Sequence, residues 1–114
     1  MPQGPIKLPF KRVKIVSTDF EVQPIPSSEV DNYAVAGTTG QSPQSPAIRI
    51  AAHTSLTGLA DTTLHEILHA CWATMNLGPT EEEERAVSAM ATALISVLRD
   101  NPKLREWLAE ACSK

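Results

Sequence analysis

The sequence predicts a small α+β domain, in which a mostly antiparallel three-stranded sheet is followed by three helices. Seven of the nine prolines lie before residue 50, and this excludes long helices from the first half. The same half contains short stretches in which apolar and polar residues alternate, as they do in half-buried strands. From Asp61 onward, apolar residues recur every three or four positions, which is the helical period. A length of 114 residues predicts one domain over 1–114.

Composition narrows the class of protein. Hydrophobic residues make up 42% of the chain and charged residues 20%, which is ordinary for a globular domain. The net charge of −3 gives no basic footprint for nucleic acid, and no apolar run is long enough for a membrane span. The start of the chain lacks the pattern of a secretory signal, and two cysteines do not make a disulfide scaffold. We therefore expect a cytoplasmic protein without nucleic-acid or membrane partners.

The first half is predicted to form the sheet. Residues 1–10 are an irregular lead-in, and residues 11–53 form a small sheet with proline-rich loops. The next segment, 54–60, is expected to be a loop. We expect strands over residues 12–17, 33–38 and 47–52, separated by loops at 24–28 and 39–46.

The helical part is predicted over residues 61–112. Asp61 is a good N-cap for a first helix, and Gly78 with Pro79 suits its end. Thr80 and Glu83 have the spacing of a capping box, so a second helix should run from Glu81 to about Arg99. Asn101-Pro102 should open a final helix, which either packs on the other two or offers Trp107 and Leu108 to a partner. The predicted core residues of the first helix are Ile67, Leu68 and Trp72, and those of the second are Val87, Met90, Ala91, Leu94, Ile95 and Leu98.

The first helix carries the stretch His65-Glu66-Ile67-Leu68-His69. Residues four apart lie on one face of a helix, so His65 and His69 can hold one metal ion. Glu66 follows the first histidine and can act as general base without being a ligand. This spacing predicts a zinc site. The same motif also occurs by chance on helices that bind nothing, but the neighbouring residues here are mostly uncharged, which favours the metal site.

A third zinc ligand is expected among the four glutamates at 81–84. The apolar stripe through Leu98, Leu94, Ala91 and Val87 leads back to Glu84, which we predict as the ligand. Glu83 is the second choice, since capping is expected to occupy its side chain. The alternative is that all four glutamates form a solvated first turn.

Two segments resemble a known family. Thr63–Cys71 resembles the extended HExxH signature of zincin metallopeptidases, with uncharged residues around the motif. Glu84–Ala91 resembles the glutamate-led helix of ImmA/IrrE-like metallopeptidases, although Ser88 stands where that family usually has asparagine. Together with Arg99-Asp100-Asn101-Pro102, these segments are similar to small phage-encoded proteins of this kind. The resemblance extends from about Ile48 to Trp107.

The resemblance implies a minimal zincin-like domain with peptidase activity, zinc as cofactor and a protein or peptide substrate. Residues 47–53 would border the cleft and pair with an extended peptide. His53 would face the cleft, although a lone histidine before a loop is more often simply exposed, and nothing in the sequence brings Tyr33 near the zinc. So short a chain offers little wall for a substrate, so a partner protein would complete the cleft. The alternative function is a zinc-stabilised module without turnover, such as a virion-associated protein.

Overall fold

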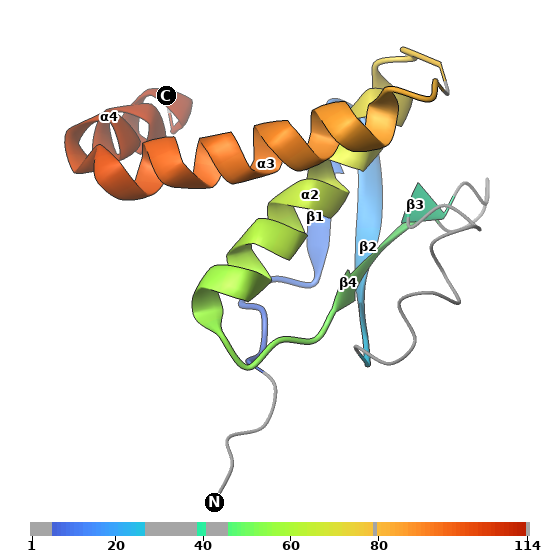
Figure 1. The fold of residues 1–114 in the computed structure, drawn as a ribbon, viewed down its shortest axis with the longest axis horizontal. Coiled ribbons are helices and arrows are strands. Elements are labelled where there is room, and N and C mark those ends of the chain that lie inside the picture. The colour runs from blue at the N-terminus through green and yellow to red at the C-terminus, as the bar shows by residue number, and fades with distance from the viewer. Residues whose placement is uncertain (1–5, 27–38, 41–45, 79, 114) are drawn as a thin grey trace, which may run out of the picture.

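The computed structural model describes residues 6–26, 39–40, 46–78 and 80–113. Its elements are β1 (Arg12–Ile15), β2 (Thr18–Ile25), β3 (Thr39–Gly40), β4 (Ala47–Ala51), α2 (Leu56–Thr74), α3 (Glu83–Asp100) and α4 (Pro102–Cys112). The sheet lies to one side of α2, and α3 crosses α2 (Figure 1). The α+β class is therefore confirmed. The predicted strand at 33–38 lies outside the described residues.

The sheet is mixed rather than mostly antiparallel. Its strand order is β1-β2-β4-β3, and the two central strands, β2 and β4, are parallel, with Val22 opposite Ile48. The outer pairs β1–β2 and β3–β4 are antiparallel. The prediction of three mostly antiparallel strands was wrong about the central pair, because that pairing joins residues far apart in the sequence and leaves no local signal.

Strand β2 was not predicted, because Pro24 and Pro26 resemble a loop. Proline is tolerated in a strand where no partner needs its N–H. The amide of Val22 points toward β1, where it bonds to the Lys11 carbonyl at 2.9 Å, and the position of Pro24 faces the same side. The pairing with β1 ends at Arg12 opposite Glu21, so Pro24 interrupts no hydrogen bond between β1 and β2.

The core lies between the sheet and α2. Alternate residues of the strands supply one face, and the helix adds Leu59 and Ala70. Ile48 and Ile50 in β4 are 0% and 1% exposed. The irregular lead-in contributes partly buried side chains to the same cluster. The buried cluster is Ile15, Phe20, Val22, Ile48, Ile50, Leu59 and Ala70, with Ile6, Leu8, Phe10, Val13, Ile67 and Cys71 packed against it.

Helix α2 begins earlier than predicted. Its N-cap is Ser55, whose hydroxyl accepts a hydrogen bond from the amide of Gly58 at 3.2 Å, whereas Asp61 lies inside the helix. The predicted loop at 54–60 is therefore mostly helical. Helix α2 also ends earlier, at Thr74. Asn76 has a φ of 58° and the Leu77 amide reaches back to the Trp72 carbonyl at 3.2 Å, so asparagine takes the C-terminal role assigned to Gly78.

Helix α3 begins at Glu83, and the predicted capping box is absent. Its N-cap is Glu82, with no capping side-chain hydrogen bond. Val87 and Ala91 are buried as expected, but Met90 is 51% exposed, so its predicted core position was wrong. Met90 lies one position before Ala91, so about 100° of helical rotation carries it off the buried stripe.

Helix α4 begins at Pro102 with Asn101 as N-cap, as predicted. It contacts α3 and has no buried residue, and Figure 1 places it at the end of α3 that points away from the sheet. Trp107 is 63% exposed and Leu108 38%. Of the two expectations for this helix, packing on the other two helices holds for its contact with α3, and the offer of Trp107 and Leu108 to a partner remains a prediction. No helix within the described ranges is long and apolar enough to cross a membrane.

Candidate metal centre

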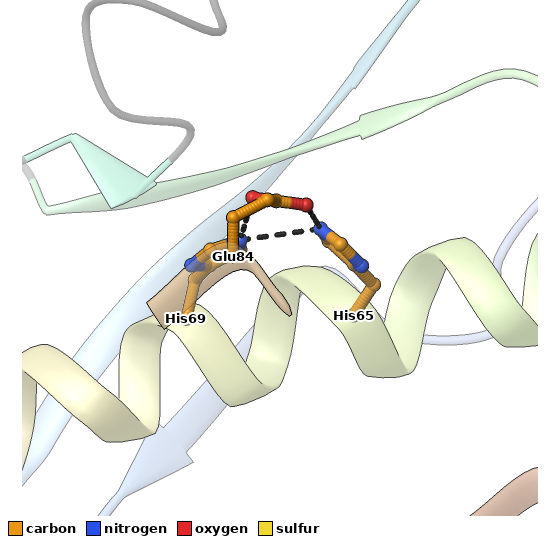
Figure 2. A group of neighbouring side chains, drawn as sticks. All are labelled: His65, His69 and Glu84. Carbon is orange, nitrogen blue, oxygen red and sulfur yellow. Dashed lines mark hydrogen bonds and ion pairs between the residues drawn. The ribbon is translucent and has the colours of Figure 1, made fainter. Parts of the chain in front are cut away.

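The histidines of α2 and a glutamate of α3 meet where the two helices cross. Nε2 of His65 and Nε2 of His69 are 3.1 Å apart. The two carboxylate oxygens of Glu84 divide between them: Oε1 lies 3.0 Å from Nε2 of His65, and Oε2 lies 2.8 Å from Nε2 of His69. Figure 2 shows both rings rising from α2 toward this carboxylate. The structure thus brings together His65, His69 and Glu84 as one group that could hold a metal ion.

The spacing of these atoms suits zinc. With Zn–N bonds of about 2.0–2.1 Å and tetrahedral angles, two ligand atoms on one zinc lie about 3.3 Å apart. The two Nε2 atoms are 3.1 Å apart, and each lies 2.8 or 3.0 Å from a different oxygen of Glu84. The nitrogens are thus within a few tenths of an ångström of the tetrahedral spacing, and the carboxylate would bring one of its two oxygens to the metal. Two imidazole nitrogens and a carboxylate oxygen are also a ligand set that zinc uses in catalytic sites.

Counting protons on His69 gives a second indication of a cation. Its Nδ1 lies 2.6 Å from Oε2 of Glu83, and its Nε2 lies 2.8 Å from Oε2 of Glu84. A neutral imidazole has one N–H, and ionised carboxylates only accept hydrogen bonds. Both contacts can be hydrogen bonds only if the ring is an imidazolium. Nε2 of His65 also lies 3.0 Å from Oε1 of Glu84, so either it donates to Glu84 and its N–H meets the N–H of His69, or it accepts from His69 and its lone pair meets the carboxylate. A cation at the Nε2 atoms removes this conflict.

The surroundings of the Glu84 carboxyl lower its pKa. Partial burial raises its pKa, but the charges of His65 and His69 and hydrogen bonds from Ser88 and His69 lower the pKa more, so the net shift is downward. The Ser88 hydroxyl donates to Oε1 of Glu84 at 3.1 Å. A low pKa keeps the carboxylate ionised, as metal binding requires. The side chain of Glu84 is 68% exposed. Glu84 therefore does not continue the buried face of α3, although the apolar stripe was used to predict its position.

The second candidate ligand, Glu83, lies on the opposite side of the His69 ring from the metal group. It contacts Nδ1 of His69, and its side chain is only 24% exposed. The sequence assigned Glu83 to helix capping, so this contact was missed. The signal that could have found it is the pair of adjacent glutamates at the start of a helix facing a histidine.

Glu66 is half-buried on α2, and its oxygen Oε1 is shielded from solvent. It is not a member of the three-residue group. Its role as general base remains a prediction, since a base need not be a ligand.

Two further side chains fix the surroundings of the group. The indole N–H of Trp72 donates to the carbonyl of Gly78 at 2.7 Å and ties α2 to the loop that leads into α3. Across the helix pair, the Thr92 hydroxyl donates to Oδ1 of Asp61 at 3.4 Å. The first contact joins α2 to the segment before α3, and the second joins α2 to α3 directly.

His53 does not join the metal group. Its Nε2 lies 2.8 Å from the hydroxyl of Thr62, and its ring packs over Gly58 in the first part of α2. The structure therefore gives His53 a packing contact with the helix rather than full exposure. Tyr33 lies outside the described residues.

Strand β4 is paired with β2 along its length and with β3 at Ala47 and Ile48. The pairing of an extended peptide with residues 47–53 remains a prediction. An apolar cavity of about 770 Å³ lies elsewhere, between the lead-in, the ends of β2 and β4, and Leu59. None of the three candidate ligands lines this cavity.

Comparison with protein-family models, with curated proteins and with solved structures finds no match to this chain.

Proposed function

We propose that this protein is a zinc-dependent metallopeptidase, with His65, His69 and Glu84 as zinc ligands and Glu66 as general base. The observation that carries the proposal is the convergence of His65, His69 and Glu84 from two helices, with one ligand atom from each residue and all three atoms within 4.8 Å of one another. The HExxH spacing supports the assignment of the base, since a purely structural site has no use for a glutamate at that position.

Zinc held there would lower the pKa of a bound water to about 7 and polarise the carbonyl of a peptide bond. The residues of this chain would do the rest. The imidazoles orient the site, and the ionised Glu84 completes it from α3. Glu66 accepts a proton during attack on the carbonyl and delivers it to the leaving amine. A partner protein that extends the cleft, a phage origin and action in the host cytoplasm belong to the same proposal.

One observation favours a second candidate, a zinc-stabilised module without turnover. The ligands come from both α2 and α3, so zinc would link the two helices and stabilise a small domain. The exposed α4 would then present Trp107 to a partner, for example in a virion.

Metal content and a Glu66→Gln variant test the two candidates. The untagged protein should bind one zinc per chain, and Glu84→Ala should lose or weaken it. Glu66→Gln should keep the zinc and lose cleavage of a denatured protein substrate. The control is Glu81→Gln, which makes the same charge change at an exposed position in the turn before α3. Zinc binding with no cleavage by the wild type across a broad peptide library would favour the stabilised module. A wild type that binds no zinc at neutral pH would refute both.

A further inference from the structure

The contact between Glu83 and His69 is among the shortest in the candidate metal centre. Oε2 of Glu83 lies 2.6 Å from Nδ1 of His69, and the side chains are 24% and 13% exposed. Glu83 is the first residue of α3, and the N-cap before it, Glu82, makes no side-chain capping hydrogen bond. The carboxylate of Glu83 is directed at the histidine.

This contact determines which nitrogen of His69 carries the proton. An ionised carboxylate only accepts, so a hydrogen bond at Nδ1 requires the N–H there. The lone pair then lies on Nε2, which is the atom that faces His65 and Glu84. Histidine ligands generally have such an outer partner, which fixes the ring and makes the metal-binding nitrogen more basic.

We propose that Glu83 is a positioning residue for the metal centre, acting through Nδ1 of His69. It orients the ring, selects the tautomer with a free lone pair on Nε2, and adds a negative charge near the cation. With Glu84, it supplies two negative charges to balance one Zn²⁺. This role rests on the proposed zinc site and extends it. Of the two adjacent glutamates, Glu84 binds the metal and Glu83 binds Nδ1 of the ligand His69.

The test measures zinc affinity by competition with a chelator in the full chain for the wild type, Glu83→Ala, Glu83→Gln, Glu84→Ala and Glu81→Gln. Loss of an outer-shell partner costs about 10–100-fold in metal affinity. We expect a loss in this range for Glu83→Ala. A smaller loss is expected for Glu83→Gln, whose amide oxygen still accepts from Nδ1 but has no charge. No change is expected for Glu81→Gln.

A second readout reports on the histidine itself. Nitrogen NMR of the zinc-loaded wild type should show the proton of His69 on Nδ1 and the metal on Nε2, and metal-free Glu83→Ala should lose the preference for the Nδ1–H tautomer. Circular dichroism of each variant checks that α2 and α3 are formed.

Three results would overturn the assignment. Zinc affinities of Glu83→Ala and Glu81→Gln that agree within about twofold would make Glu83 a surface carboxylate. Zinc on Nδ1 of His69, with loss of binding in Glu83→Ala but not in Glu84→Ala, would make Glu83 the ligand. A wild type that binds no zinc would refute the zinc site and the role of Glu83 together, whereas the first two results leave the zinc site standing.

Discussion

Zinc should raise the thermal stability of this protein through the three side chains that join α2 to α3. A ligand that binds only the folded state stabilises it by about 2.7 kcal/mol when its free concentration is 100 times its Kd. For a chain of 114 residues, an unfolding entropy of about 2.1 cal/mol/K per residue gives about 240 cal/mol/K. Dividing the stabilisation of about 2.7 kcal/mol by this unfolding entropy predicts a rise in Tm of about 11 °C.

Histidine variants separate this effect from general stabilisation by metal. In His65→Ala and His69→Ala the rise should be lost, because each removes one of three ligand atoms. His53→Ala is the matched control, since His53 bonds to Thr62 and lies outside the metal group. It should lower the starting Tm by about 4 °C through loss of a hydrogen bond worth about 1 kcal/mol, and keep the zinc-dependent rise.

Differential scanning calorimetry or fluorimetry with free zinc buffered by a chelator measures the shift. A rise of equal size in His65→Ala and the wild type would refute the ligand assignment, because zinc would then act at other groups. The absence of any rise in a wild type saturated with zinc would refute coupling of the site to the fold.

Three further predictions concern single positions. Val16 has a φ of 57° in the β1–β2 turn and is 72% exposed, and a branched side chain is strained in this left-handed conformation. Val16→Asn should therefore raise the free energy of unfolding, measured in urea, by about 1 kcal/mol. A loss of stability would contradict the strain. A Cβ on Gly58 would lie 2.8 Å from Nδ1 of His53, so Gly58→Ala should destabilise the wild type. In the His53→Ala background the clash is gone, and the same substitution should stabilise the protein by about 0.5–1 kcal/mol. Equal effects in both backgrounds would exclude the clash. Burial raises the pKa of the Cys71 thiol, whereas Cys112 is exposed. Iodoacetamide at neutral pH should therefore alkylate Cys112 first, as followed by mass spectrometry. Equal rates at the two cysteines would refute the burial of Cys71.

Local patterns in the sequence predicted those elements whose signals are local. The alternation in β4 and the Asn101-Pro102 start of α4 both correspond to observed elements. The start of α2 was missed because Asp61 has the side chain of a good N-cap, whereas in the fold Ser55 caps the helix and Gly58 makes room for the ring of His53. The parallel pairing of β2 with β4 was missed for a related reason: it is decided by contacts between residues distant in the chain.

The candidate metal centre shows the same limit at atomic scale. The i, i+4 spacing is enough to predict that His65 and His69 share a face, since helix geometry alone decides it. The sequence also indicated a carboxylate near Glu84, but it could not distinguish the two nitrogens of His69. In the structure, the last turn before α3 places Glu83 at Nδ1 and Glu84 at Nε2, because consecutive helical residues differ by about 100° around the axis. The position at which α3 begins thus gives Glu83 and Glu84 different contacts on the same histidine. Insertion of one residue between Glu84 and the buried Val87 would rotate both glutamates by about 100° relative to the packed face of α3. It should therefore lower zinc affinity more than substitution of Glu81 or Glu82, which are exposed and outside the metal group.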